Sequence, residues 1–175
     1  MAGPRFGARR RRGSPGRRER KVLDDKAARL AAADLLSRRA WTQVELTRRL
    51  VRRGAPPEVA ADVVADMISR GYVDDAAFAR HFVETRAARG YGVARLSADL
   101  RARGVNAALV IAAVAELDGA AQLERARLQA RKRLPALRRA DRSRAAARLR
   151  DYLLRRGFAA GVVMRVVREA LAAEE

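Results

Sequence analysis

A segment of about 50 residues occurs three times along the chain, and this repetition limits the folds that the chain can adopt. The stretch 45–67 aligns with the stretch 95–117 at an offset of 50 residues, and a third copy occupies 148–171. Such a period indicates an array of small units that pack against their neighbours, because one unit has too little core to fold alone. Each copy carries two leucines and then a glycine at four-residue spacing: Leu46, Leu50 and Gly54; Leu96, Leu100 and Gly104; Leu149, Leu153 and Gly157.

Each copy has the pattern of two helices separated by a glycine. Leucines at i and i+4 lie on one face of a helix, and the glycine that follows can take the left-handed conformation that ends it. Another helical stretch precedes each pair, at 26–39, 76–89 and 120–134. Ala, Leu and Arg, which dominate the composition, all favour helices. We therefore expect an all-α fold of three tandem three-helix repeats packed end to end.

The repeats divide the chain into four segments. Residues 1–21 form a tail rich in Gly, Pro and Arg, which we expect to be disordered because it has few apolar residues and its charges repel one another. We place repeat 1 at 22–74, repeat 2 at 75–118 and repeat 3 at 119–175. Helix-end signals agree with this division, namely the capping box of Thr42 and Glu45, the helix-starting Pro56 and Pro57, the N-cap Asn106 and the helix-stopping Pro135.

Two adjacent aspartates, Asp74 and Asp75, raise the question of a catalytic or metal site. They follow Gly71, which suits the end of one helix, and precede a helix predicted to begin at Ala76. One of them therefore takes the N-cap position, where a carboxylate accepts backbone N–H groups and stabilises the helix by about 1 kcal/mol. A metal site or an acid–base pair needs further ligands or a partner base, and none is nearby in the sequence. We expect a structural role for the pair.

Neighbouring aromatic and glycine residues are interpreted as structural too. Tyr72 and Val73 are predicted to fill the joint between repeats 1 and 2, and Phe78 continues the apolar stripe one turn later. Gly90 and Gly92 form a G-x-G motif that lacks the third glycine and the preceding strand of a dinucleotide-binding loop, so a tight turn between helices is the better interpretation. The predicted structural signature comprises Gly71, Tyr72, Asp74, Asp75, Phe78, Gly90, Gly92 and Gly104.

Isolated residues offer no catalytic or metal centre. His81 is the only histidine, and one histidine cannot assemble a usual metal site or catalytic triad. Trp41, just before the capping box, is interpreted as a core residue, with a base-stacking platform as the alternative. We expect no catalytic residue, metal or cofactor, and thus a protein that is not an enzyme.

The net charge of +19 indicates an anionic partner, and nucleic acid is the first candidate. The charge lies at the two ends, with a net of +8 in 1–21, +2 in 22–122 and +12 in 123–168. No apolar run approaches the roughly 18 residues that span a membrane, and the first residues lack the apolar segment of a signal peptide. The lack of cysteine agrees with a reducing compartment. We expect a soluble, cytoplasmic monomer that does not contact membranes.

Basic residues recur near the repeat glycines and form a dense cluster in repeat 3. Packing of the repeats is predicted to align the first group as a stripe, although solvated helix faces are the alternative for each residue. Basic residues spread over several repeats, with few Asn or Gln, favour contact with a nucleic-acid backbone or an extended protein surface over base reading by a helix–turn–helix domain. The candidates are Arg48, Arg49, Arg52, Arg53, Arg101, Arg103, Arg131, Lys132, Arg133, Arg138, Arg139, Arg155 and Arg156.

Three stretches resemble the RecX family of regulators of the RecA recombinase. They are LLSRRAWTQVELTRRLVRRG (35–54), GYVDDAAFAR (71–80) and RGYGVARLSADLRARGV (89–105), in the order and spacing of that family. The resemblance covers about 22–172, is most specific in the first two repeats and does not include the tail.

The resemblance implies a curved, elongated array that binds the RecA filament on single-stranded DNA in its groove. Family members limit filament extension, ATPase activity and strand exchange. They have no catalytic residues, so the resemblance implies none in this chain. Direct, salt-sensitive contact with single-stranded DNA is expected from the charge whichever function is right. A general basic protein that coats DNA is the alternative function.

Overall fold

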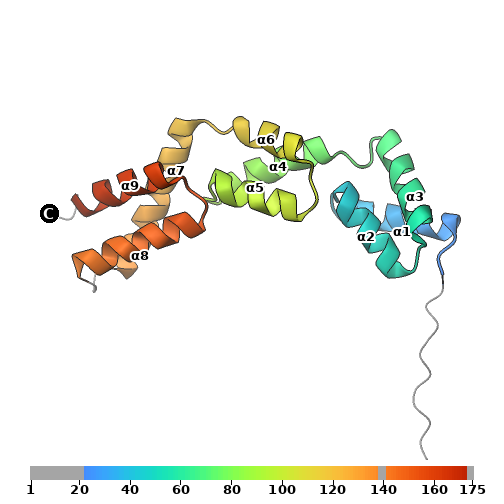
Figure 1. The fold of residues 1–175 in the computed structure, drawn as a ribbon, viewed down its shortest axis with the longest axis horizontal. Helices are drawn as coiled ribbons and strands as arrows, with labels where there is room; N and C mark the ends of the chain where they lie inside the picture. Colours follow the sequence, from blue (N-terminus) through green and yellow to red (C-terminus); the bar gives the residue numbers. More distant parts are fainter. Residues whose placement is uncertain (1–21, 138–140, 173–175) are drawn as a thin grey trace, which may run out of the picture.

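The computed structural model describes residues 22–137 and 141–172, so the predicted disordered tail at 1–21 lies outside the described residues. Within them the chain forms nine α-helices and one 3-10 turn, with no strand, as an elongated array of three repeats (Figure 1). The all-α repeat fold predicted from the sequence is therefore confirmed. The helices are α1 (Asp25–Arg38), α2 (Gln43–Arg53) and α3 (Pro57–Ser69); α4 (Asp75–Ala88), α5 (Val93–Ala102) and α6 (Ala107–Ala115); and α7 (Gly119–Arg133), α8 (Arg142–Arg155) and α9 (Ala160–Ala172), with the 3-10 turn at Leu134–Ala136.

Each repeat has its own hydrophobic core. The three clusters of buried side chains are drawn from α1–α3, from α4–α6 and from α7–α9, respectively. The six leucines of the repeated pattern are fully buried in these clusters. Since each fully buried leucine contributes about 1.5–3 kcal/mol, the repeated leucine pair is a main source of each repeat's stability.

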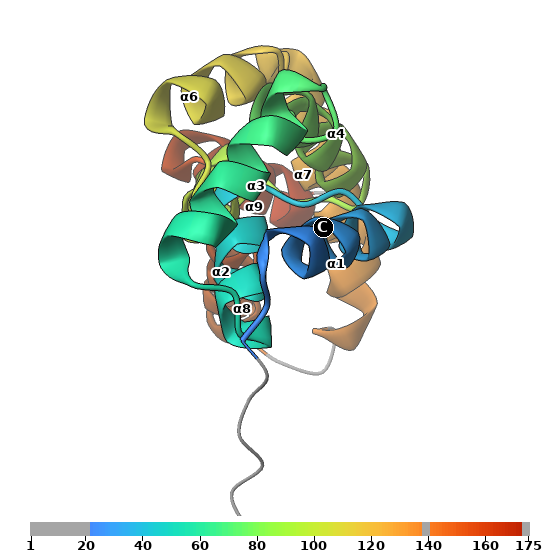
Figure 2. The same ribbon diagram turned by 90° about the vertical axis from the view of Figure 1, so that its right-hand side faces the viewer.

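The second helices of the three repeats follow one another end to end. The start of α2 contacts the end of α5, where the Thr42 hydroxyl donates to the Arg103 carbonyl, and the start of α5 contacts the end of α8, where Gly92 N–H donates to the Arg156 carbonyl. Successive repeats are also rotated relative to one another. The third helix of repeat 1, α3, runs steeply in Figure 1, whereas the third helix of repeat 2, α6, is nearly level, and the two also differ in direction in the end-on view of Figure 2. None of the helices in the described part of the chain is both long and apolar enough to cross a membrane.

The helix ends agree with the sequence signals, with small differences. Gly54, Gly104 and Gly157 have φ angles of 105°, 83° and 86°, in the left-handed region that favours glycine. Asn106 caps α6 with a side-chain bond from Ala108 N–H, as predicted. The first helix of each repeat begins one residue earlier than predicted, because an aspartate (Asp24, Asp74 and Asp118, respectively) occupies the N-cap position before it.

Candidate partner-binding surface

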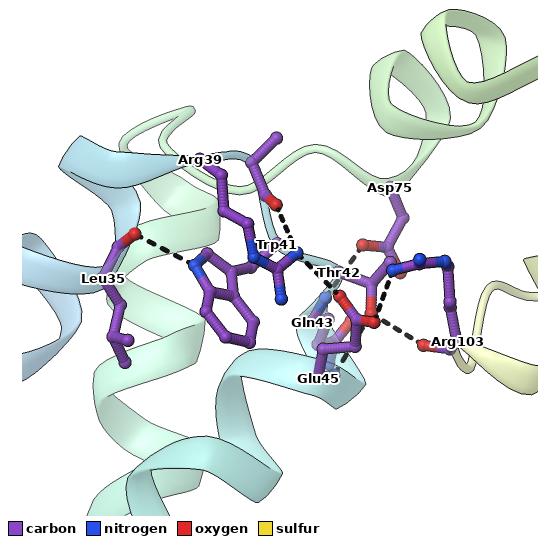
Figure 3. A network of polar contacts seen from close by, with 9 residues as sticks. Leu35, Arg39, Trp41, Thr42, Gln43, Glu45, Asp75 and Arg103 are labelled. Atoms are coloured by element: carbon purple, nitrogen blue, oxygen red, sulfur yellow. Dashed lines mark hydrogen bonds and ion pairs between the residues drawn. The ribbon is translucent and has the colours of Figure 1, made fainter. Parts of the chain in front are cut away.

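The joint between repeats 1 and 2 is held by a polar network around buried Thr42 (Figure 3). The Thr42 hydroxyl donates to the Arg103 carbonyl at 2.7 Å and accepts from Glu45 N–H at 3.1 Å. The Arg103 guanidinium in turn donates to the Glu45 carboxylate at 2.7 Å. The predicted capping box is thus only half formed, because Glu45 turns its carboxylate across the joint to a cation.

The aspartate pair has two different structural roles. One carboxylate oxygen of Asp74 accepts from Ala76 N–H at 2.8 Å and from Ala77 N–H at 2.9 Å, which confirms the predicted N-cap. The Asp75 carboxylate instead crosses the joint and accepts from Gln43 N–H at 2.9 Å. No group of three or more His, Asp or Glu side chains suited to a metal ion occurs in the described ranges.

Tyr72 does not fill the joint as the sequence predicted. Its side chain is 64% exposed, whereas that of the next residue, Val73, is buried in the core of repeat 1. Val73 takes the buried place in the core of repeat 1, and Tyr72 lies at the surface of the joint. Trp41 agrees better with its prediction, because it packs against the same core and its indole N–H donates to the Leu35 carbonyl at 2.9 Å.

The joint between repeats 2 and 3 is made of backbone hydrogen bonds. Gly92 N–H donates to the Arg156 carbonyl at 2.8 Å, and Ala94 N–H donates to the Gly157 carbonyl at 3.1 Å. A Cβ atom on Gly92 would lie only 2.3 Å from the Gly157 carbonyl oxygen. Glycine is therefore required here because two backbone segments of the chain approach closely, at the position that Thr42 occupies in the first joint.

Arg156 reinforces the second joint with its side chain. Its guanidinium donates to the carbonyls of Arg89 and Gly90 at 2.9 and 3.2 Å. It also lies 5.2 Å from the ring centre of Tyr91 and 5.1 Å from that of Tyr152, within the range of cation–π attraction. Repeat 3 thus places one cation between an aromatic ring of repeat 2 and one of its own.

The arginine before each repeat glycine has a contact within the chain. Arg103 and Arg156 bind across the two joints, and Arg53, in repeat 1, lies 3.5 Å from the Asp34 carboxylate. These three arginines therefore contribute to the fold. From the sequence, their recurrence before each repeat glycine was interpreted as a surface that binds a partner. The other contacts across the joints, above all those of Glu45 and Asp75, could not be predicted from the neighbouring residues in the sequence.

The remaining candidates differ in exposure. Arg49 is half-buried, and its Nε has no hydrogen-bond partner. Arg52 and Arg155 occupy equivalent positions, but repeat 2 has Ala102 there, so the predicted stripe of arginines is interrupted. Arg138 and Arg139 lie outside the described residues. The exposed candidates are Arg48, Arg52, Arg101, Arg131, Lys132, Arg133 and Arg155.

An acidic residue organises part of the basic third repeat. The Glu169 carboxylate accepts from Arg127 Nε at 2.8 Å and from Arg165 Nε at 3.0 Å, and Arg127 also pairs with Glu124. The hydrogen bonds from Arg127 and Arg165 lower the pKa of Glu169 to about 2, and those to Glu169 and Glu124 raise the pKa of Arg127. These carboxylates offset little of the charge, because 123–169 carries 15 basic and four acidic residues.

Three family models match successive parts of the chain. The models described as the first, second and third three-helix domains of RecX match residues 28–67, 74–114 and 120–167, respectively. Each match spans one group of three helices, in the order in which the structure places them.

Relatives and solved structures agree with these matches. The regulatory protein RecX of Mycobacteroides abscessus is 44% identical over 143 residues, which cover 81% of this chain and 70% of that protein. That of Thermobifida fusca is 40% identical over 149 residues, which cover 84% and 80%. The crystal structure of RecX from Lactobacillus salivarius superposes with a TM-score of 0.74 at 17% identity, covering 83% of this chain and 96% of the other. A second crystal structure of a regulatory protein RecX gives 0.77 at 21% identity, covering 81% and 72%.

Proposed function

The chain belongs to the RecX family of regulatory proteins, and we propose that it binds the filament of the RecA recombinase on single-stranded DNA. It lies in the filament groove as a cytoplasmic monomer and limits filament extension, ATPase activity and strand exchange. The observation that carries the proposal is the agreement of three tandem domain matches with three helical repeats joined end to end.

The shape and charge of the described residues support this proposal. A helical filament repeats its surface along a groove, and an elongated array of similar units can contact several copies of that surface at once (Figure 1). Exposed basic side chains lie in all three repeats and are densest at the end of α7, in Arg131, Lys132 and Arg133. Such groups attract phosphate or acidic protein surface in a salt-dependent way.

A general DNA-coating protein is the second candidate function. The observation that favours it is the net charge of +19, with +8 in the first 21 residues and +12 in 123–168. A chain with this distribution binds DNA without sequence preference, because each phosphate contact releases counterions. The two functions differ in whether the recombinase is required.

The deciding experiment is a titration of the single-stranded-DNA-dependent ATPase of RecA with the full chain at near-physiological salt. Suppression below one regulator per RecA protomer supports action on the filament. Suppression that disappears when DNA is added in excess supports competition for DNA instead. A truncation that begins at Val22 separates the tail from the array, and retained suppression assigns the effect to the repeats.

Charge reversal tests which repeats contribute to binding. We expect Arg131→Glu, Lys132→Glu and Arg133→Glu together to weaken filament binding by at least tenfold and to reduce its salt dependence. A second variant with Arg48→Glu, Arg52→Glu and Arg101→Glu makes the same change in repeats 1 and 2. If neither variant changes binding while both keep the wild-type circular dichroism, the exposed arginines are not the contact surface.

A further inference from the structure

A groove with an aromatic lining opens at the first joint and has no assigned role. It has a volume of about 500 Å³ and lies between the α1–α2 and α3–α4 connections and the outer face of α4. Trp41, Tyr72, Phe78 and Phe82 contribute its aromatic side chains, and the rings of Phe78 and Phe82 stack with their centres 6.1 Å apart. The volume suits one large side chain or a short segment of a ligand.

The second joint closes the corresponding space. Ala40, which precedes Trp41, is exposed and lines the groove, whereas its counterpart Gly90, which precedes Tyr91, is buried. The Gln129 side chain packs directly on Gly90, is 6% exposed and accepts a hydrogen bond from the Tyr152 hydroxyl at 3.1 Å. The groove is therefore a departure from the repeat and not a necessary consequence of packing one repeat on the next.

The charge around the groove favours an anionic occupant. Arg86, on α4, and Arg89, which directly follows this helix, lie along one side of the groove. The only carboxylate among the lining residues is that of Asp74, and its Oδ1 already accepts two backbone hydrogen bonds. Cationic side chains beside an apolar floor select a ligand that combines negative charge with an apolar group.

The arrangement of the rings favours a peptide over single-stranded DNA. Base stacking needs free aromatic faces. Here the Arg39 guanidinium lies 3.4 Å from the ring centre of Trp41, and that of Arg86 lies 5.2 Å from the ring centre of Phe82. Bases stacked on Trp41 or Phe82 would have to displace these cations, whereas a single apolar side chain can contact Tyr72 and the Ala77 methyl group, which also line the groove.

We propose that this groove binds an acidic peptide segment that presents one large apolar side chain. The apolar side chain contacts Phe78 and Tyr72, and flanking carboxylates pair with Arg86 and Arg89. The inference rests on the proposed function in one respect: if that function is right, the recombinase is the protein that carries the segment. It adds a specific anchor to contacts that are otherwise governed by net charge.

Trp41 is the only tryptophan of the chain, so its emission reports directly on the groove. The full chain is titrated with a nine-residue peptide of glutamates around a central phenylalanine, with the same peptide carrying a central serine, and with a nine-nucleotide oligo-dT. We expect a saturable change in Trp41 emission with the phenylalanine peptide at a concentration at least tenfold lower than with the serine peptide. Equal responses to both peptides, a stronger response to oligo-dT, or no saturable response would each overturn the proposal.

Two pairs of substitutions, on α4 and at its C-cap residue Arg89, locate the binding. Ala77→Tyr fills the groove, and Arg89→Glu replaces a positive charge beside it with a negative one. Each substitution is expected to lower the affinity for the phenylalanine peptide by at least tenfold. Ala88→Tyr and Arg80→Glu make the same changes at exposed α4 positions outside the groove and are expected to leave binding unchanged. Equal effects of both pairs would refute a site in the groove. The peptide titration tests the groove whether or not the wild-type chain suppresses the ATPase. The same variants in the ATPase titration then show whether the groove contributes to filament binding.

Discussion

Gly92→Ala tests whether the second joint depends on the close approach of two backbones. Gly92 has φ −94°, which alanine adopts freely, so any loss of stability comes from the added methyl group and not from backbone strain. That methyl would lie 2.3 Å from the Gly157 carbonyl oxygen, 2.4 Å from the Gly157 carbonyl carbon and 2.5 Å from the Phe158 nitrogen, all of them main-chain atoms that cannot rotate away. The joint must therefore open or remain closed under strain.

The two outcomes have similar costs. Opening removes the hydrogen bonds from Gly92 N–H and Ala94 N–H, which are worth about 1 kcal/mol each and about 2 kcal/mol together. Remaining closed costs about 1–3 kcal/mol, the usual range for overpacking. We therefore expect Gly92→Ala to lower the free energy of unfolding by about 2 kcal/mol.

Urea unfolding followed by circular dichroism measures this change. Because the loss lies in the coupling between repeats 2 and 3, the unfolding transition should also broaden or split. Gly119→Ala is the matched control, since its Cβ would have no heavy atom within 4 Å, and it should be neutral or stabilising by about 0.5 kcal/mol. Wild-type stability and a single sharp transition in Gly92→Ala would refute the proposed role of the second joint.

The remaining predictions concern caps and acidic groups. Asp74→Ala should lower the free energy of unfolding by about 1 kcal/mol through loss of the α4 cap, and Asp75→Ala should weaken the first joint through loss of its bond to Gln43, both measurable by urea unfolding. An inactive double variant with unchanged stability would contradict this structural role. The folded-state pKa of Glu169 is about 2, whereas its ordinary value is about 4.3. The ionised Glu169 therefore contributes its full stabilisation above about pH 4.3, and this contribution is lost as the pH falls toward 2. Glu169→Gln should therefore be less stable than wild type at neutral pH, and the difference should shrink on acidification in thermal melts recorded from pH 7 to pH 2; an equal difference at all pH values would contradict it.

The helices could be predicted from sequence because the signals that define them are local. Leu96 and Leu100, followed by Gly104, lie within one helix and its end, so their spacing alone identifies the buried face and the stop. The one-residue error in the start of α4 arose because Asp74 and Asp75 are both acceptable caps by residue type. Only the three-dimensional structure distinguishes the residue that caps the helix from the one that binds Gln43.

The joints could not be predicted because their contacts join residues far apart in the chain. The Arg103–Glu45 pair spans 58 residues, and it converts a predicted capping box into a contact between repeats. A signal for Arg103 and Arg156 did exist, since an arginine precedes every repeat glycine. Recurrence of a charge at a fixed place is equally compatible with a partner-binding stripe and with a contact between repeats, and only geometry separates the two.

The two joints differ in chemistry, and this difference affects how salt acts on the protein. The first joint contains the Glu45–Arg103 ion pair, whose side chains are partly exposed, so added salt screens it. The second joint relies on backbone hydrogen bonds and on Arg156 beside two tyrosines, which salt weakens less. A salt titration of partner binding therefore reports both the loss of contacts to phosphate or acidic protein and a weakening of the first joint, where the aromatic groove lies. Comparing wild type with Glu45→Gln separates these contributions, because this variant lacks the ion pair at every salt concentration while keeping the exposed arginines.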